Sequence, residues 1–292
     1  MTSCLSRGRP LPFLDRISFN HATFGPEASF RTFLETVAET GARGVGVWTE
    51  RLDGLSPIAA GELIRDHGLA ISGVNRGGFF TGSTKEQRDA AIDQTLRQVE
   101  ATAELQADTL VIVPGGLQSD LKDIRVARDQ VKDGLAIVAS FARDHGVRLA
   151  IEPFHPALSA LRGVVNTLDL AMDLCEVHGG HVGVVTDIFH LWWDPGVYQA
   201  ISRAGTRIFG HHLCDWKLDA VDPVADRGVM GDGVADIPGI TAAVMDAGYS
   251  GWMEIEIFSK NDLWTMAPSA IASRCLERAR ECLDEAEKMR KI

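Results

Sequence analysis

The chain has 292 residues, of which 45% are hydrophobic and 24% are charged, as in a soluble globular protein that buries a sizeable core. Its net charge of −11 and the lack of a Lys/Arg-rich block disfavour nucleic acid as a partner. Five cysteines without a C-x-x-C pair favour a reducing cytoplasm, and the lack of a signal-like or spanning apolar run predicts neither export nor a membrane partner.

Short apolar or β-branched segments alternate with longer amphipathic stretches along the whole chain. Strands are predicted, in chain order, at 16–20, 44–48, 70–75, 109–113, 148–152, 182–187, 207–213 and 252–257. Helices are predicted between and after them, among others at 27–39, 85–104, 125–144, 167–177 and 269–290. Eight βα units without a long linker predict the α/β class and a (β/α)8 TIM barrel, with one domain over residues 1–292.

Four glycines and one long irregular stretch lie between the predicted helices and strands. Gly41, Gly68, Gly146 and Gly248 each precede a predicted strand by a few residues, where a helix is expected to end with a positive φ. The longest irregular stretch, 215–236, follows the seventh strand. Active-site loops of such barrels gather at the carboxyl ends of the strands, so this stretch is predicted to be a lid or a substrate loop.

Four consecutive predicted strands end in ionisable side chains. These ends carry Glu152, Asp187 followed by His190, the pair His211 and His212, and the pair Glu254 and Glu256. Unpaired charges on buried strands would each cost several kcal/mol, on the order of a lost ion pair, and a shared cation would neutralise them. Three carboxylates and one imidazole suit Mn²⁺, our first choice, or Mg²⁺, Co²⁺ or Zn²⁺.

Simpler interpretations of the same residues exist. Glu152 alone is compatible with an ion pair to an arginine across the barrel, and Asp187 with His190 is compatible with a capped turn. Strand alternation sends His211 and His212 to opposite faces, so only one of them faces the barrel axis. Glu254 and Glu256 share a face, which leaves both as candidates. The coincidence at four strand ends favours a metal site.

Several motifs resemble the sugar phosphate isomerase/epimerase family of xylose-isomerase-like TIM barrels over essentially the whole chain. They are His212-Leu-Cys-Asp215, Glu256-Ile257-Phe258 and DRGVMGDG, while SFNHAT and EIFSKNDLW are similar to the keto-inositol isomerase branch. The resemblance implies that Glu152, Asp187, His212 and Glu256 bind one divalent metal ion. It also implies proton abstraction next to a metal-polarised carbonyl, through an enediolate.

The resemblance also assigns roles. It implies that Glu152 and Glu256 are the acid/base pair as well as ligands, and that Asp187 and His212 are mainly ligands. Further catalytic candidates are His155 and His190, and the substrate-binding candidates are Arg227, His190, Trp193 and Asn75. His155 is the group able to replace an acid that ketose 3-epimerases of the family carry where this chain has Leu158, but packing is an equal alternative for it. Packing also competes with sugar stacking for Trp193.

The leading hypothesis is an isomerase or epimerase of a keto sugar or keto-inositol, with a small sugar or polyol as substrate. A lyase using the same first step is the alternative: a keto-inositol dehydratase, or a deglycosidase of 3-oxo-glycosides or C-glycosides with His155 or His190 as the acid. The acidic balance disfavours an endonuclease, and the intact ligands with Arg227 disfavour a pseudoenzyme. A homo-oligomer or a small accessory subunit is compatible with the sequence.

Overall fold

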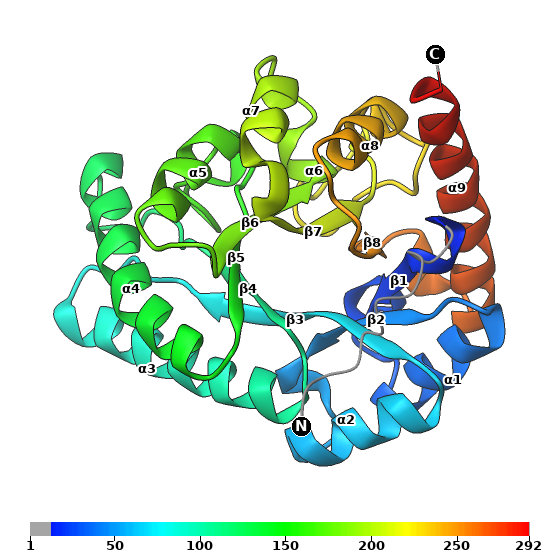
Figure 1. The fold of residues 1–292 in the computed structure, drawn as a ribbon, viewed down its shortest axis with the longest axis horizontal. Coiled ribbons are helices and arrows are strands. Elements are labelled where there is room, and N and C mark those ends of the chain that lie inside the picture. Colours follow the sequence, from blue (N-terminus) through cyan, green and yellow to red (C-terminus); the bar gives the residue numbers. More distant parts are fainter. Residues whose placement is uncertain (1–12, 292) are drawn as a thin grey trace.

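A computed structural model describes residues 13–291, which form a closed barrel of eight parallel strands inside a ring of helices (Figure 1). Each strand pairs with the next, and β8 pairs with β1 to close the sheet. The strands are β1 (Ile17–Asn20), β2 (Gly44–Trp48), β3 (Ala70–Gly78), β4 (Thr109–Val113), β5 (Arg148–Ile151), β6 (Val182–Asp187), β7 (Ile208–Leu213) and β8 (Met253–Ile255). The predicted single-domain TIM barrel is therefore confirmed, and only the outermost residues of the predicted 1–292 range lie outside the described part.

The helices follow the strands in alternation. They are α1 (Phe30–Thr40), α2 (Pro57–Asp66), α3 (Lys85–Glu104), α4 (Ile124–Asp144), α5 (Leu168–Glu176), α6 (Ile188–Leu191), α7 (Val197–Ala204), α8 (Ile237–Asp246) and α9 (Pro268–Met289). The first helix begins three residues later than the predicted start, because the Ser29 side chain accepts a hydrogen bond from the Thr32 amide and caps it. Within residues 13–291, no helix is both long and apolar enough to cross a lipid bilayer.

The ends of the helices and strands determine which residues lie at the mouth of the barrel. Gly41, Gly68, Gly146 and Gly248 all have positive φ angles, between 71° and 97°, as predicted. Strand β3 runs to Gly78 and not to residue 75, with an irregular register between Val74 and Gly77. Strands β5 and β8 end one or two residues before their predicted ends, so that two of the predicted ligands lie just past the ladder.

A small apolar layer lies below the mouth, inside the barrel. Val111, Ala150, Val185 and Phe209 form a buried cluster separate from the main core. Ala150 and Val185 each precede a predicted ligand by two residues, so strand alternation directs them to the same inner face. The part of the barrel interior next to β4–β7 is thus apolar under a polar rim, as expected when the chemistry sits at the carboxyl ends of the strands.

A buried histidine in the first loop predicts acid sensitivity. His21 Nε2 lies 3.0 Å from the Ala28 carbonyl oxygen, and its ring stacks on Phe33. Burial and the nearby Arg51 lower the pKa of His21 from 6.5 to about 4. Between pH 6.5 and about pH 4, the unfolded chain binds a proton at this histidine and the folded chain does not. The free energy of unfolding therefore decreases by roughly 3 kcal/mol as the pH is lowered through this range. Urea unfolding at pH 7 and pH 4.5 measures it, and an equal pH dependence in His21→Gln would contradict it.

Candidate active site

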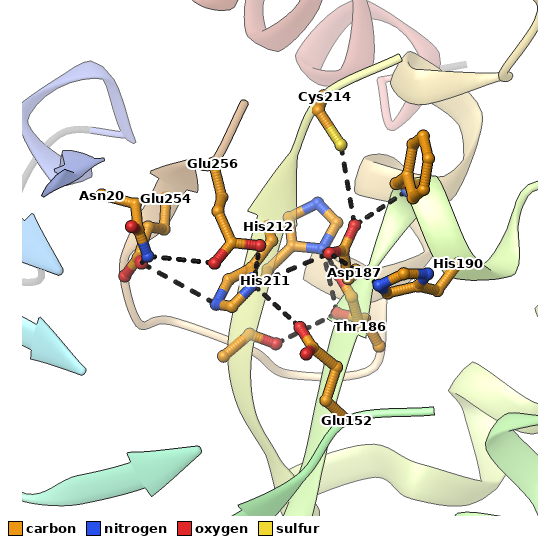
Figure 2. Close-up of polar contacts among 12 residues, drawn as sticks. Asn20, Glu152, Thr186, Asp187, His190, His211, His212, Cys214, Glu254 and Glu256 are labelled. Atoms are coloured by element: carbon orange, nitrogen blue, oxygen red, sulfur yellow. Dashed lines mark hydrogen bonds and ion pairs between the residues drawn. The ribbon is translucent and has the colours of Figure 1, made fainter. Parts of the chain in front are cut away.

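Four buried side chains converge at the carboxyl ends of β5 to β8. Glu152 follows β5, Asp187 ends β6, His212 lies on β7 and Glu256 follows β8. One nitrogen or oxygen atom from each of them lies within 4.8 Å of the atoms of the others. Figure 2 shows the three carboxylates gathered around the His212 ring. The structure therefore brings together the set that the sequence analysis predicted as metal ligands.

The spacing of these atoms fits a single cation. His212 Nδ1 lies 3.4 Å from Glu152 Oε1, 3.5 Å from Glu256 Oε2 and 4.0 Å from Asp187 Oδ2. Ligand atoms held about 2.0–2.2 Å from one ion lie roughly 3 to 4.4 Å from each other. Glu152 Oε1 and His212 Nδ1 are buried without a hydrogen-bond partner. Such orphaned atoms are what a coordination site presents, so the residues fit a divalent ion.

The charges of the four clustered residues also favour a bound cation. Arg227 Nη1 lies 3.1 Å from both Asp187 Oδ2 and Glu256 Oε2, and no other arginine forms an ion pair with the cluster in the described chain. Three carboxylates and one guanidinium leave two negative charges, which one divalent cation neutralises. Burial lowers the pKa of His212, but the carboxylates of Glu256 and Glu152 outweigh it and raise that pKa well above its ordinary value. The cluster thus attracts positive charge strongly.

A fourth carboxylate supports the cluster from below. Asn20 Nδ2 donates to Glu254 Oε1 at 2.7 Å and to Glu256 Oε1 at 3.1 Å, so both glutamates face inward (Figure 2). Glu254 Oε1 lies 4.0 Å from His212 Nε2, the ring nitrogen that points away from the other carboxylates. A Cβ at Gly46 would come 2.2 Å from Glu254 Oε1, so glycine makes room for it. Glu254 thus lies behind the imidazole, and its charge contributes to the raised pKa of His212.

The neighbouring histidine faces the other way, as strand alternation requires. His211 Nε2 lies 3.0 Å from Thr241 Oγ1 on α8, and His211 Nδ1 lies 2.9 Å from Thr186 Oγ1. Its role is to tie β7 to the outer helix layer. Of the pair that the sequence left open, only His212 takes part in the cluster.

A pocket opens above the cluster. Its wall includes Glu152 and Glu256 but neither Asp187 nor His212, and it also includes His190, Arg227 and Asn75. Two of the four clustered residues are thus open to a bound molecule, while the other two are covered. This division matters for their chemistry, because only groups that reach the pocket can exchange a proton with a substrate.

Two predicted residues lie outside the pocket wall. The His155 ring stacks on Trp216 with ring centroids 4.3 Å apart, and the Trp193 ring lies edge-on to His155. Both contact His190 from behind: the His155 amide donates to His190 Nδ1 at 3.3 Å, and Trp193 Nε1 donates to the His190 carbonyl oxygen at 2.9 Å. The structure therefore places them as supports of His190.

Other residues of the pocket wall escaped the sequence analysis. Trp48, Arg76, Arg162 and Phe258 all line it. Trp48 ends β2 and Arg76 lies near the end of β3, so extending the strand-end criterion to these two strands would have found them. Arg162 lies in the connection after β5, where no periodic pattern marks it.

The loop 215–236 carries Arg227 over the cluster, and a buried aspartate holds the loop together. Asp215 Oδ2 accepts hydrogen bonds from the amides of Gly231 and Gly233, and Oδ1 accepts from the amides of Trp216 and Ala235. The Arg227 guanidinium lies between aromatic rings, 4.4 Å from the Phe189 centroid and 4.7 Å from that of Phe258. This stretch thus forms an ordered substrate-facing loop.

Replacing Asp215 by asparagine is expected to lower the free energy of unfolding by about 2 kcal/mol, because an amide cannot accept all four hydrogen bonds and leaves buried donors unpaired. Asp219→Asn, at an exposed position of the same loop, is the control and should change stability by less than about 0.5 kcal/mol. Urea denaturation measures both. Equal effects of the two substitutions would show that the Asp215 hydrogen bonds do not stabilise the loop.

Comparison with known proteins places the chain in a family. The model of the xylose isomerase-like TIM barrel family matches residues 34–290. A 3-dehydroshikimate dehydratase of Pseudomonas putida is 29% identical over 247 residues, which are 81% of this chain but 37% of that protein. The chain thus spans little more than a third of this relative. An inosose isomerase of Bacillus licheniformis is 23% identical over 262 residues, 83% of this chain and 89% of that protein.

Solved structures agree with this placement. A crystal structure of a protein from Sinorhizobium meliloti 1021 superimposes with a TM-score of 0.89 at 40% identity, covering 92% of this chain and 98% of that one. A crystal structure of the IOLI protein with a bound zinc atom has a TM-score of 0.81 at 20% identity, covers 93% and 99% of the two chains, and shows the shared fold. This chain belongs to the xylose isomerase-like TIM barrel family.

Proposed function

We propose that this chain is a divalent-metal-dependent isomerase or epimerase that moves a proton next to the carbonyl group of a keto sugar or keto-inositol. The observation that supports it most is that Glu152 and Glu256 belong to the four-residue cluster and also line the pocket. A cation bound there supplies Lewis-acid polarisation of a substrate oxygen. Mn²⁺ is our first choice, and Mg²⁺, Co²⁺ and Zn²⁺ suit the same donors.

The two pocket carboxylates differ in their readiness to carry a proton. Burial raises the pKa of Glu152 to about 7, and the neighbouring Glu256 and Asp187 add to the shift. Burial also raises the pKa of Glu256, but the charges of His212 and Arg227 outweigh it and lower that pKa to about 2. Environments that separate two carboxylates in this way assign different roles to them. We therefore assign proton transfer to Glu152, which forms no ion pair with an arginine in the described chain, whereas Glu256 stays ionised beside Arg227 at 3.1 Å.

His190 is the proposed hydrogen-bond donor to the substrate. Burial and the charge of Arg227 lower its pKa well below the ordinary value, so the imidazole is neutral. Its Nδ1 accepts from the His155 amide, which leaves the hydrogen on Nε2. Nε2 is buried without a hydrogen-bond partner within the described residues, 3.7 Å from Asp187 Oδ2, and the residue lines the pocket. His155 and Trp193 act by holding His190, and Arg227 and Asn75 contact substrate oxygens.

A lyase is the second candidate, and the similarity to a dehydratase favours it. The first step is the same proton abstraction by Glu152. The substrate then expels a hydroxyl group or an aglycone from the β-carbon, and the leaving group takes up the proton that Glu152 removed. Where the bond that breaks is C–O, His190 of the pocket wall is placed to donate a hydrogen bond to the departing oxygen. Where it is C–C, as in a C-glycoside, the proton goes to the departing carbon. A keto-inositol dehydratase and a deglycosidase of 3-oxo-glycosides or C-glycosides both fit this scheme.

Proton exchange in heavy water tests the proposal. The Mn²⁺-loaded protein is incubated in D₂O with 2-keto-myo-inositol, D-fructose, 3-dehydroshikimate and a 3-oxo-glucoside, and the products are analysed by NMR and mass spectrometry. An isomerase or epimerase incorporates deuterium at the carbon next to the carbonyl of an isomer. A lyase releases water or the aglycone. Neither deuterium incorporation nor elimination with any of the four compounds would count against both candidates.

We also propose a cytoplasmic location and assembly as a homo-oligomer or with a small accessory subunit. Cys175, Cys214, Cys275 and Cys282 are all free thiols, and the first three are buried. Burial raises the pKa of Cys175 to about 12, which keeps this thiol unreactive. Free buried thiols suit a reducing compartment.

A further inference from the structure

Two arginines of the pocket wall form no ion pair with an acid in the part of the chain that the structure describes. Arg76 on β3 and Arg162 in the connection between β5 and α5 line the same pocket as Glu152 and Arg227. Within residues 13–291, neither guanidinium lies within the 4.0 Å of a carboxylate oxygen that defines an ion pair, in contrast to Arg227. Both side chains are only partly buried, so a molecule that enters the pocket can reach them.

Aromatic rings, and not an acid, hold Arg76 in place. Its guanidinium carbon lies 4.8 Å from the ring centroid of Trp48 and 5.0 Å from that of Phe79. Trp48 is itself fixed, because its Nε1 donates to Asn20 Oδ1 at 2.7 Å. Stacking uses the faces of the guanidinium and leaves the N–H groups at its edge free. Arg76 is therefore oriented while its hydrogen-bond donors remain available.

The backbone around Arg162 is fixed by neighbouring loops. Its carbonyl oxygen accepts from the Gly115 amide at 3.1 Å, and its amide donates to the Leu158 carbonyl oxygen at 2.8 Å. Burial and then the charges of Arg76 and Arg227 lower the pKa of Arg162, and Asp222 opposes them. Three guanidinium groups thus lie close enough to repel one another. An anion bound beside Arg76 and Arg162 would relieve this repulsion, since the carboxylates that pair with Arg227 do not reach these two groups.

The charges of the pocket leave a place for that anion. Arg227 is neutralised by Asp187 and Glu256, and a divalent cation neutralises what remains of the cluster. Arg76 and Arg162 then contribute two positive charges that form no ion pair within the described residues, in a chain whose net charge is −11. Because the rest of the protein repels anions, a local surplus of positive charge at the pocket is a specific feature.

We propose that Arg76 and Arg162 bind an oxyanion of the substrate, a carboxylate or a phosphate, in the part of the pocket walled by β3 and the connection after β5. The planar guanidinium matches both oxyanions with paired N–H groups. The inference rests on the proposed function, since it adds a second recognition group to the substrate of the same site. The substrate is then an acidic keto polyol, whose carbonyl lies at the cation and whose charged end lies at the two arginines.

Matched sugars test the inference directly. D-fructose, D-fructose 6-phosphate and D-fructuronate differ only at carbon 6, and their binding to the Mn²⁺-loaded protein is measured by calorimetry. At least one of the two anionic sugars should bind about tenfold or more tightly than D-fructose, and the stronger of them identifies phosphate or carboxylate as the group. Arg76→Met and Arg162→Met should each weaken its binding about tenfold and leave the binding of D-fructose unchanged.

Arg97→Met is the matched control, because Arg97 is exposed on α3, donates a hydrogen bond to Gln94 and does not line the pocket. Equal affinities for the three sugars, no binding of either anionic sugar, or equal weakening of the neutral and anionic sugars in the variants would each overturn the inference. Bound metal is measured in the same samples. Failure of the proposed function would appear as missing metal or missing deuterium exchange, whereas failure of this inference would appear as a lost charge preference with metal retained.

Discussion

His212→Ala is expected to lose stoichiometric metal. In the wild-type protein, His212 Nδ1 lies within 4.0 Å of an oxygen atom from each of the three clustered carboxylates. His212 is therefore the member of the cluster that lies close to all three of the others. Mutation of residues that only support a metal ligand changes the metal affinity by about 10- to 100-fold. Removal of the ligand itself should therefore weaken the binding of Mn²⁺ at least about 100-fold. Metal analysis after dialysis and calorimetric titration measure this.

A thermal measurement gives an independent readout of the same change. A ligand that binds only the folded state at 100 times its dissociation constant stabilises it by about 2.7 kcal/mol, so Mn²⁺ should raise the Tm of the wild-type protein but not that of His212→Ala. His211→Gln is the control, since His211 is equally buried but contacts Thr186 and Thr241 outside the cluster. If His212→Ala retained metal as well as the control does, the proposed site would be wrong.

Much of the site was predictable because the direction of a side chain on a strand follows from its position in the sequence. Apolar segments followed by an ionisable residue mark the carboxyl ends of the barrel strands, and all such ends meet at one mouth. The alternation of side chains along a strand correctly predicted that His211 and His212 point to opposite faces, and that Glu254 and Glu256 point to the same face. The structure decides between the two candidates, because Glu256 lines the pocket and Glu254 does not.

The pocket wall was harder to predict because it depends on contacts between distant segments. Strand β3 extends through Gly77 and Gly78, residues with low β-propensity, so the sequence suggested an end before Arg76. Arg162 reaches the pocket because its backbone bonds to Gly115, in the connection after a different strand. The sequence suggested His155 as a catalytic residue and Trp193 as a substrate contact, with packing as the alternative for each. In the structure His155 stacks on Trp216, and both residues contact His190.

Glu152→Gln is expected to stop proton exchange while leaving a metal site that can still be filled. The amide keeps an oxygen to bind the cation but cannot carry a proton, and a positioned general base contributes about 10²- to 10⁴-fold. At saturating Mn²⁺, deuterium incorporation into the substrate identified in heavy water should fall by that factor. Glu152, and not Glu256, is expected to exchange the proton because it lines the pocket without an arginine partner in the described chain, whereas Glu256 is paired with Arg227.

Asp187→Asn provides the matched comparison. It removes the same charge from the same cluster, but Asp187 does not line the pocket and has no access to the substrate proton. Both variants should therefore need more Mn²⁺ than the wild-type protein, and only Glu152→Gln should stay inactive in exchange once the metal is saturating. An equal loss in both at full metal occupancy would show that Glu152 acts only by holding the cation, and the proton would then have to be carried by another group of the pocket wall.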